Sequence, residues 1–242
     1  GILVRYTYTN PLLTREDLSD AYCNFCMKAA DNGMNEVLVV SDILEEYIRK
    51  NYPCYKINSS TCKELKELDA INEELDKDYQ LVVLDYNMNN QFELLEKIKR
   101  KDKCEILVNA CCIPNCPRRA EHYRTIAKQQ RIALQNRRNP TDKKIPIPGW
   151  HCEYGDHNSI HTIRNYVTYV SPEAIWEKYV PMGFTNFKIE GRTANLFQLV
   201  DSYCHYMIRP EYEGEARLLL LANLEKSHII SVNRPRPAKW EG

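Results

Sequence analysis

Short runs of β-branched and aromatic residues recur along the chain and alternate with charged segments of helical pattern. This alternation is typical of repeated βα units, in which parallel strands form one sheet and helices cover it. Seven such units in one α/β domain favour a (β/α) barrel of the TIM type over an open sheet. The predicted strands are residues 4–9, 36–40, 55–58, 80–85, 105–109, 166–170 and 184–190.

The whole chain, residues 1–242, is predicted to form this single barrel-like domain. Position 1 is Gly rather than Met, and the first predicted strand begins almost at once. An eight-stranded barrel would therefore have its first strand upstream of Gly1. No Gly-rich phosphate loop follows any predicted strand, which argues against a dinucleotide-binding Rossmann domain.

Cap residues mark the predicted helix starts. Thr14 is followed three positions later by Asp17, a variant of the capping box, and Gly33 is suited to end that helix. Pro172 would occupy the first position of another helix. The other predicted caps are Ser41, Thr61 and Ser171.

The 33 basic and 33 acidic side chains cancel, so no overall field favours a nucleic acid or a membrane. No apolar run approaches the roughly 20 residues of a membrane-spanning helix. The N-terminus lacks the pattern of a secretory signal. We therefore expect a cytoplasmic protein that does not enter a membrane.

Ten cysteines among 242 residues are an enrichment. In a reducing compartment, clustered cysteines more often bind metals or clusters than form disulfides. Isolated cysteines usually pack as small hydrophobic side chains. We expect this of Cys54, Cys62, Cys104 and Cys204.

A Cys-rich and basic insertion, residues 110–165, interrupts the alternation after one central strand. Barrel enzymes carry their chemistry on the loops that follow their strands, so we expect the front of this insertion to be functional. Residues 135–148 are rich in polar residues and proline, and we expect them to be mobile.

Three cysteines of the insertion form the strongest chemical signal. Cys112 and Cys116 are four positions apart in a loop that Pro114 and Pro117 stiffen, so both thiolates can reach one centre. Cys152 would return to the same place. Three soft thiolates suit zinc or an iron–sulfur cluster. The alternative is three unrelated reduced thiols.

Cys23 and Cys26 form a CxxC motif on a predicted helix. Either this spacing places both on a core-facing stripe, or the pair supplies a further ligand or a redox centre. His151, His157 and His161 lack a surrounding helix pattern, and we expect them on a surface loop rather than in a metal site.

Polar residues follow the predicted strands, and in a barrel they converge at one mouth. Period-two alternation places Lys188 and Glu190 opposite their apolar neighbours, and buried charges are costly unless they are paired or functional. Arg192 is suited to bind a carboxylate or phosphate. The predicted catalytic residues are therefore Asp85, Asn109, Lys188, Glu190 and Arg192. The alternative is a structural Lys188–Glu190 pair with Arg192 at the surface.

Residues 118–144 carry a local excess of positive charge on a predicted helix and loop. Tyr123 and His122 are suited to stack on a base, so RNA is a possible partner. Because the chain as a whole is neutral, a solvated helix is favoured.

Two segments together resemble a known family. Ile106-Leu107-Val108-Asn109 with Cys112, Cys116, Pro117-Arg118 and His122, then Phe187-Lys188-Ile189-Glu190-Gly191-Arg192, resemble the collagenase-like peptidases, which are peptidases of unknown catalytic type. The resemblance covers about residues 5–208 and is specific only in these motifs. It implies a barrel domain. It also implies kinship with iron–sulfur proteins of oxygen-independent ubiquinone and RNA-base hydroxylation, in which four cysteines hold a [4Fe–4S] cluster.

Through this resemblance, Cys112, Cys116 and Cys152 match the expected cluster ligands, with Cys111 as an alternative to Cys112. The closing cysteine pair of the family is not seen near Cys152. Cys23 or Cys26 would then supply the last ligand, or the cluster is incomplete.

These observations favour an iron–sulfur enzyme of hydroxylase type that acts on a small molecule or an RNA base, with Lys188, Glu190 and Arg192 positioning the substrate. The first alternative is a peptidase with a metal-bound water near Asp85 or Glu190. The second is a zinc-stabilised, non-enzymatic barrel that binds RNA through residues 118–144.

Overall fold

The computed structural model describes residues 2–140, 143–154, 160–191 and 196–231. The chain divides into two compact units, Gly1–Glu190 and Gly191–Gly242. The expected domain of residues 1–242 spans both. The second unit contains α9 (Leu196–Met207) and α10 (Glu213–Lys226), which the Arg217 Nε–Asp201 Oδ1 ion pair joins at 2.6 Å.

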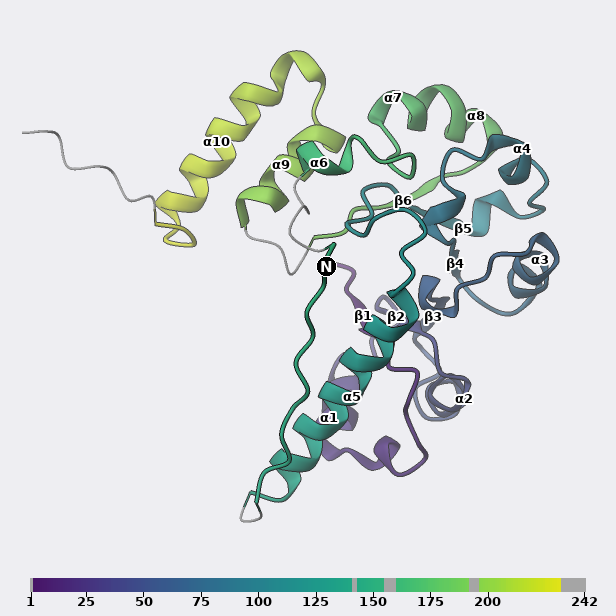
Figure 1. Ribbon diagram of the computed structural model, residues 1–242, viewed down its shortest axis with the longest axis vertical. Helices are drawn as coiled ribbons and strands as arrows, with labels where there is room; N and C mark the ends of the chain where they lie inside the picture. Colours follow the sequence, from purple (N-terminus) through teal and green to yellow (C-terminus); the bar gives the residue numbers. More distant parts are fainter. Residues whose placement is uncertain (1, 141–142, 155–159, 192–195, 232–242) are drawn as a thin grey trace, which may run out of the picture. The chain divides into compact units, whose positions relative to one another are not determined.

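The first unit is built on a curled, all-parallel six-stranded sheet, as the α/β prediction requires (Figure 1). The strands pair in the order of the chain, from β1 to β6, and the described strands form a half-barrel rather than a closed barrel. Their bounds are β1 Arg5–Tyr8, β2 Glu36–Val39, β3 Lys56–Ser59, β4 Leu81–Val83, β5 Cys104–Leu107 and β6 Asn186–Lys188.

Connections between neighbouring parallel strands are almost always right-handed, so a sheet in sequential order carries its helices on one face. The other face is then concave. The connecting helices are α1 Ala21–Ala29, α2 Asp42–Asn51, α3 Leu68–Asp76, α4 Phe92–Leu95, α5 Arg119–Arg138, α6 Ile160–Ile163, α7 Pro172–Ala174 and α8 Val180–Met182. A π-helical segment, Ile175–Tyr179, joins α7 to α8, and 3-10 turns span Asp17–Ser19, Thr61–Lys63, Tyr86–Met88 and Lys101–Lys103.

Side-chain contacts identify the two faces of the sheet. On the helix-covered face, the Ser59 hydroxyl donates to Glu74 of α3 at 2.6 Å, and the Phe187 ring lies 6.2 Å from that of Tyr179. Alternate positions of the strands therefore point to the inner, concave face. There Arg5 of β1 reaches Glu105 of β5, across the curve of the sheet. The predicted placement of Lys188 and Phe187 on opposite faces is confirmed.

The prediction of a strand at residues 166–170 is wrong. Backbone bonds from Tyr166 to Ile163 and from Tyr169 to Tyr166 close turns there. The side-chain amide of Asn89 donates to the Thr168 carbonyl at 2.7 Å, and that of Asn90 donates to the carbonyls on either side, at 2.9 and 2.7 Å. β6 pairs with the edge of β5 at which a strand of residues 166–170 would have joined the sheet.

Two predicted caps are confirmed, since the hydroxyls of Ser41 and Ser171 accept backbone N–H groups at the starts of α2 and α7. The helix expected between Thr14 and Gly33 is divided instead. Asp17 accepts the Thr14 N–H within a 3-10 turn, and α1 begins only after Asp20, whose carboxylate accepts the Cys23 N–H at 2.8 Å.

Among the described residues, every helix is too short or too polar to span a lipid bilayer. All ten cysteines are free thiols. Cys104 and Cys204 are buried, as expected of small hydrophobic side chains, whereas Cys54 is exposed and Cys62 is half-buried.

Candidate functional site

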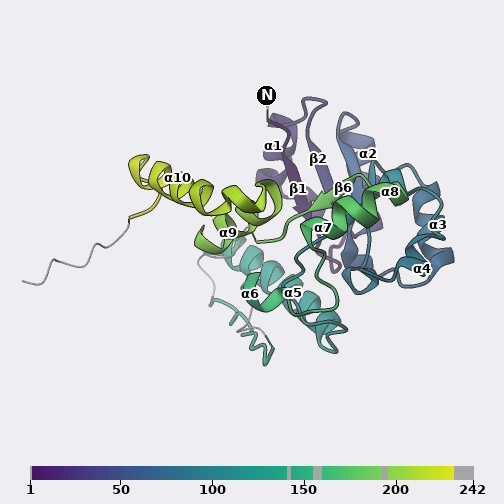
Figure 2. The same ribbon diagram turned by 90° about the horizontal axis from the view of Figure 1, so that it is seen from above.

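The basic helix α5 lies past the carboxyl ends of the strands (Figure 2). Its first turn is fixed by Arg119, whose guanidinium donates to the Asp85 carboxylate after β4 at 2.7 Å. Further along, Asn10, after β1, donates to the Ala127 carbonyl at 3.2 Å. The helix therefore spans the mouth of the half-barrel from β4 to β1.

Asp85 and Arg119 form a buried ion pair, with side-chain exposures of 1% and 5%. The other Asp85 oxygen accepts two N–H groups of Asn87, at 2.9 and 3.0 Å. Arg119 also donates to Thr61 and to the Tyr123 hydroxyl, and its guanidinium lies 4.4 Å from the centre of the Tyr86 ring. Asp85, predicted as catalytic, thus holds α5 on the sheet.

Asn109 joins the ends of β5 and β6. Its side-chain amide donates to the Glu190 carbonyl at 2.9 Å, and its carbonyl oxygen accepts the Glu190 N–H at 2.6 Å. Asn109 is therefore a positioning residue for Glu190 rather than a group that faces substrate. The Glu190 carboxylate is exposed and accepts the Cys111 N–H at 3.0 Å. Arg192 lies outside the described residues.

The structure brings Cys112, Cys116 and Cys152 into one region. The Cys112 thiol packs against Tyr86 and lies beside the Cys116 thiol and within electrostatic range of Cys152. Burial first, and then these two thiols, raise the pKa of Cys112 to about 11. The Tyr86 hydroxyl is buried and faces Cys112, without a partner at hydrogen-bonding distance among the described residues.

The segment around Cys152 is held there by the start of α5. Arg118 donates to the His151 carbonyl at 3.1 Å, and its guanidinium lies 4.4 Å from the centre of the Trp150 ring. The His122 ring stacks on the same tryptophan, with 4.9 Å between ring centres. The expected return of this segment to the mouth is confirmed.

These thiols do not yet form a ligand set. Among the described residues, no three His, Cys, Asp or Glu side chains have the spacing of a metal site. Cys111 is half-buried beside Glu190, and burial followed by that carboxylate raises its pKa to about 12. Binding a metal would require the loop to draw its sulfurs closer.

Cys23, predicted as a cluster ligand, lies elsewhere. It is exposed on α1, and the cap residue that accepts its N–H, Asp20, is paired with Arg137 at 3.6 Å. Arg137 and Arg119 are 18 positions apart on α5, or roughly 27 Å along the helix axis. Cys23 and Cys112 therefore cannot bind one ion. Since Cys23 is exposed, it does not belong to a core-facing stripe either.

The inner face carries a charged network that the sequence did not reveal. Arg5 Nε donates to Glu36 at 2.8 Å, and Arg5 Nη1 donates to both oxygens of Glu105, at 2.6 and 2.8 Å. The Asn58 amide donates to the same Glu36 carboxylate at 2.9 Å. The available signal was a charged residue at an inward position of three strands: Arg5 of β1, Glu36 of β2 and Glu105 of β5.

Lys188 faces this network from β6, in register with Leu107, two positions beyond Glu105. Burial is the largest influence on the pKa of Lys188 and lowers it, and the positive charge of Arg5 also lowers it. The groups that act in the opposite direction are Glu105, Glu190 and Cys62. The residues that the structure describes provide no ion pair or hydrogen bond to its Nζ. A structural Lys188–Glu190 salt bridge is therefore not formed.

The excess positive charge of α5 is largely paired. Arg131 lies 3.4 Å from Asp17, and Arg138 lies 3.3 Å from Asp20. Arg119 is buried against Asp85. Pairing reduces the charge left for a phosphate backbone, as the solvated-helix interpretation requires.

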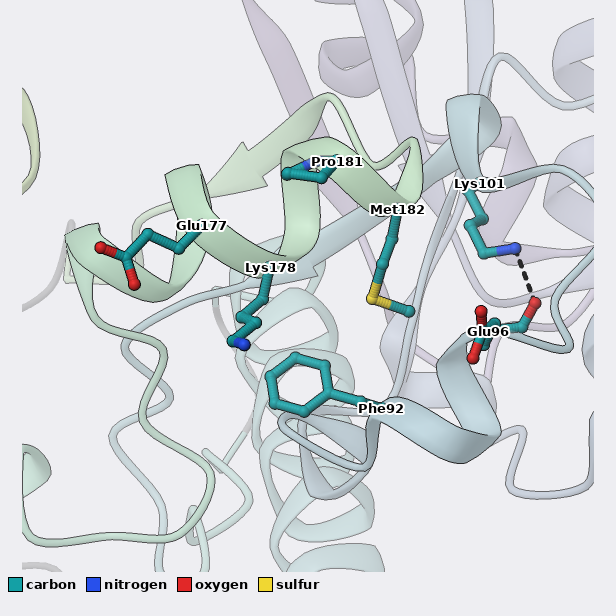
Figure 3. A pocket seen from close by; sticks show the side chains of 7 residues that line it. All are labelled: Phe92, Glu96, Lys101, Glu177, Lys178, Pro181 and Met182. Carbon is teal, nitrogen blue, oxygen red and sulfur yellow. Dashed lines mark hydrogen bonds between the residues drawn. The ribbon is translucent and has the colours of Figure 1, made fainter.

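A cavity of about 490 Å³ opens between α4 and the α7–α8 region (Figure 3). Phe92 and Met182 line its apolar part, and Lys101 donates to the Glu96 carbonyl at 2.7 Å along its edge. None of the predicted site residues lines this cavity.

No family model, curated protein or solved structure matches this chain. The resemblance to the collagenase-like peptidases therefore stays a prediction from the motif residues.

Replacing Lys188 by methionine is expected to change how stability depends on pH. The pKa of an unfolded lysine is about 10.4, and in the folded chain it is lower, so the unfolded chain binds more protons between the two values. The loss of stability that Lys188 causes is therefore at its full size below the pKa of the folded chain. This loss disappears as the pH rises to the lysine pKa of the unfolded chain. The advantage of the variant over wild type should shrink with rising pH in urea unfolding from about pH 7 to about pH 10.

Lys56→Met is the matched control, because Lys56 is an exposed lysine on β3 of the same sheet. A difference between Lys188→Met and wild type that stays constant with pH would contradict the lowered pKa.

Proposed function

We propose that this protein is an iron–sulfur-binding enzyme whose cluster is held by Cys112, Cys116 and Cys152 at the carboxyl end of the half-barrel. One observation carries the proposal: Cys112 and Cys116, from the loop after β5, lie together with Cys152, from 36 positions beyond Cys116. The Arg118–His151 bond fixes this return.

The chemistry of the loop fits a cluster. Thiolates are soft ligands suited to iron–sulfur clusters and to zinc, and a bound metal replaces the thiol protons. Burial is the largest cause that raises the pKa of Cys112, and the Cys116 and Cys152 thiols add to it, so a bound cation would be needed to favour the thiolate form in this loop. Cys111 lies in the same loop and is the alternative to Cys112.

The activity that we propose is an oxygen-independent, hydroxylase-type reaction on a small molecule or an RNA base. Glu190 supports this assignment, since its carboxylate is exposed and held against the Cys111 N–H. Lys188 lies on the inner face beside the mouth. In this proposal, both residues position the substrate together with Arg192.

The sequential, all-parallel order of the six curled strands supports assigning the fold to the TIM-like barrels. Ten free thiols support a reducing, cytoplasmic setting for the enzyme. The peptidase alternative has less support because Asp85 is committed to Arg119, and the RNA-binding alternative has less because the charges of α5 are paired.

The test is anaerobic reconstitution with ferrous iron and sulfide, followed by iron and sulfide analysis and absorbance spectroscopy. A [4Fe–4S] cluster gives about four irons per chain and a broad visible band. Each of the variants Cys112→Ala, Cys116→Ala and Cys152→Ala should lose most of this iron, because each removes a ligand.

Cys23→Ala and Cys54→Ala are the controls and should retain the wild-type iron content, since both residues are exposed and Cys23 lies near the far end of α5. Less than about one iron per chain in the wild type would refute the proposal. Stoichiometric zinc without a visible band would instead favour the zinc alternative.

A further inference from the structure

The inner face of the half-barrel contains an amine that the proposed cluster does not use. Lys188 projects from β6 toward the Arg5–Glu36–Glu105 network, and the described residues leave its Nζ without an ion pair or hydrogen bond. The carboxylate best placed to bind it is already engaged, since both oxygens of Glu105 accept Arg5 Nη1. The lone pair of Nζ is therefore not committed to a structural bond.

The surroundings of Lys188 favour its neutral form. Burial and the Arg5 guanidinium of β1 disfavour a positive charge on the Lys188 amine. Three groups favour that charge: Glu105 of β5, Glu190 beyond β6, and Cys62 of the turn after β3. The net effect is a pKa below that of an ordinary lysine. A neutral amine in a desolvated site is a nucleophile, and such lysines form Schiff bases with carbonyl substrates.

We propose that the Lys188 amine is a nucleophile that forms an imine with a small aldehyde or ketone bound on the inner face of the half-barrel. Nζ adds to the carbonyl carbon, and a proton moves from nitrogen to oxygen to give a carbinolamine. Protonation of its hydroxyl then expels water and leaves the protonated imine. One amine, one carbonyl compound and one proton become one iminium and one water, and no oxidant or reductant is needed.

Glu190 is the group placed to transfer that proton. It lies two positions beyond Lys188, and its charge acts on the Lys188 amine. Its carboxylate is exposed to solvent and accepts the Cys111 N–H at 3.0 Å, while the Asn109 side chain bonds both the N–H and the carbonyl of Glu190. A carboxylate in this place can take up a proton from solvent and pass it to the carbinolamine hydroxyl, which then leaves as water.

The experiment is reductive trapping near neutral pH with sodium cyanoborohydride, followed by peptide mapping by mass spectrometry. Propanal is the neutral probe and pyruvate the anionic one. Ordinary lysines, with a pKa of about 10.4, are almost fully protonated at this pH and react slowly. Lys188 should be alkylated at least about tenfold faster than Lys56, the exposed lysine of β3, because a larger share of its amine is neutral when the pKa is lowered.

Lys188→Arg keeps a cation but cannot form an imine, so this variant should lose the fast-labelling peptide, while Lys56→Arg should retain it. Glu190→Gln should slow trapping without changing the labelled position. Labelling of Lys188 no faster than that of Lys56 in the wild-type protein would overturn the proposal, and this comparison needs no variant to fold.

This inference does not depend on the cluster, so trapping is done on both metal-free and iron-loaded protein. Fast labelling of Lys188 in a chain that assembles no cluster would leave this inference standing and refute the iron–sulfur proposal. A chain that assembles the cluster but labels Lys188 slowly in both forms would overturn this inference and leave the iron–sulfur proposal standing.

Discussion

Arg119→Met is expected to destabilise the first unit by about 3–5 kcal/mol, the cost of leaving one partner of a buried ion pair without its counter-charge. In this variant the Asp85 carboxylate, which is 1% exposed, would lose the guanidinium that lies 2.7 Å away. The bond that joins α5 to Thr61 would be lost as well, together with the bond from Arg119 to the Tyr123 hydroxyl within the helix. Urea unfolding followed by circular dichroism measures the change.

Arg138→Met is the matched control on the same helix. Arg138 also pairs with an aspartate, but its side chain is 40% exposed, so its loss should cost less than about 1 kcal/mol. Adding Asp85→Asn to Arg119→Met should recover part of the stability, because it removes the uncompensated charge. Equal losses for the two arginine variants would show that the Asp85–Arg119 pair does not anchor α5.

Arg5→Met is expected to cost a similar amount, about 3–5 kcal/mol, because it leaves two carboxylates facing each other on the inner face. The side chains of Glu36 and Glu105 are 8% and 6% exposed, and Arg5 lies 2.8 and 2.6 Å from them. Without Arg5 the two carboxylates would lack their counter-charge and repel each other. Removing one of the two negative charges should therefore recover part of the lost stability.

Thermal and urea unfolding at neutral pH test this expectation. Glu105→Gln in the Arg5→Met background should restore stability at neutral pH, and the double-mutant cycle isolates the coupling. Arg15→Met is the control, since Arg15 and its partner Glu46 are both largely exposed, and no measurable change is expected. No recovery of stability when Glu105→Gln is added to Arg5→Met would contradict the network.

The strand at residues 184–190 shows what local pattern is able to predict. Its alternation placed Lys188 on the face opposite Phe187, and this placement is confirmed, with Phe187 on the helix-covered face. Residues 166–170 have the same alternation of aromatic and β-branched side chains but do not form a strand. Their carbonyls accept amide groups of Asn89 and Asn90, nearly 80 positions away, and a pattern of nearby residues contains no information about such partners.

The predicted site residues likewise divide into those that local pattern groups correctly and those whose roles depend on distant partners. Spacing grouped Cys112 with Cys116 and the return of Cys152 was expected, whereas the Arg118–His151 bond that holds Cys152 there was not predicted. The CxxC motif suggested Cys23 as a ligand, but Cys23 lies near the far end of α5, away from the thiols at the start of this helix. Asp85 and Asn109 were correctly expected at strand ends. Their roles in holding α5 and Glu190 depend on partners 34 and 81 positions away.

The amino-acid sequence by itself determined the α/β class, the parallel sheet, the starts of α2 and α7 at their serine caps, and the loop in which the thiols gather, because periodicity and caps act over a few residues. Only the tertiary structure decided that the described strands stop at a half-barrel and that α5 crosses its mouth. It also decided that Arg5 pairs with two buried glutamates, while the Lys188 amine has no ion pair or hydrogen bond among the described residues. Burial and charge pairing depend on residues brought together from distant parts of the chain, so they arise only when the sheet curls.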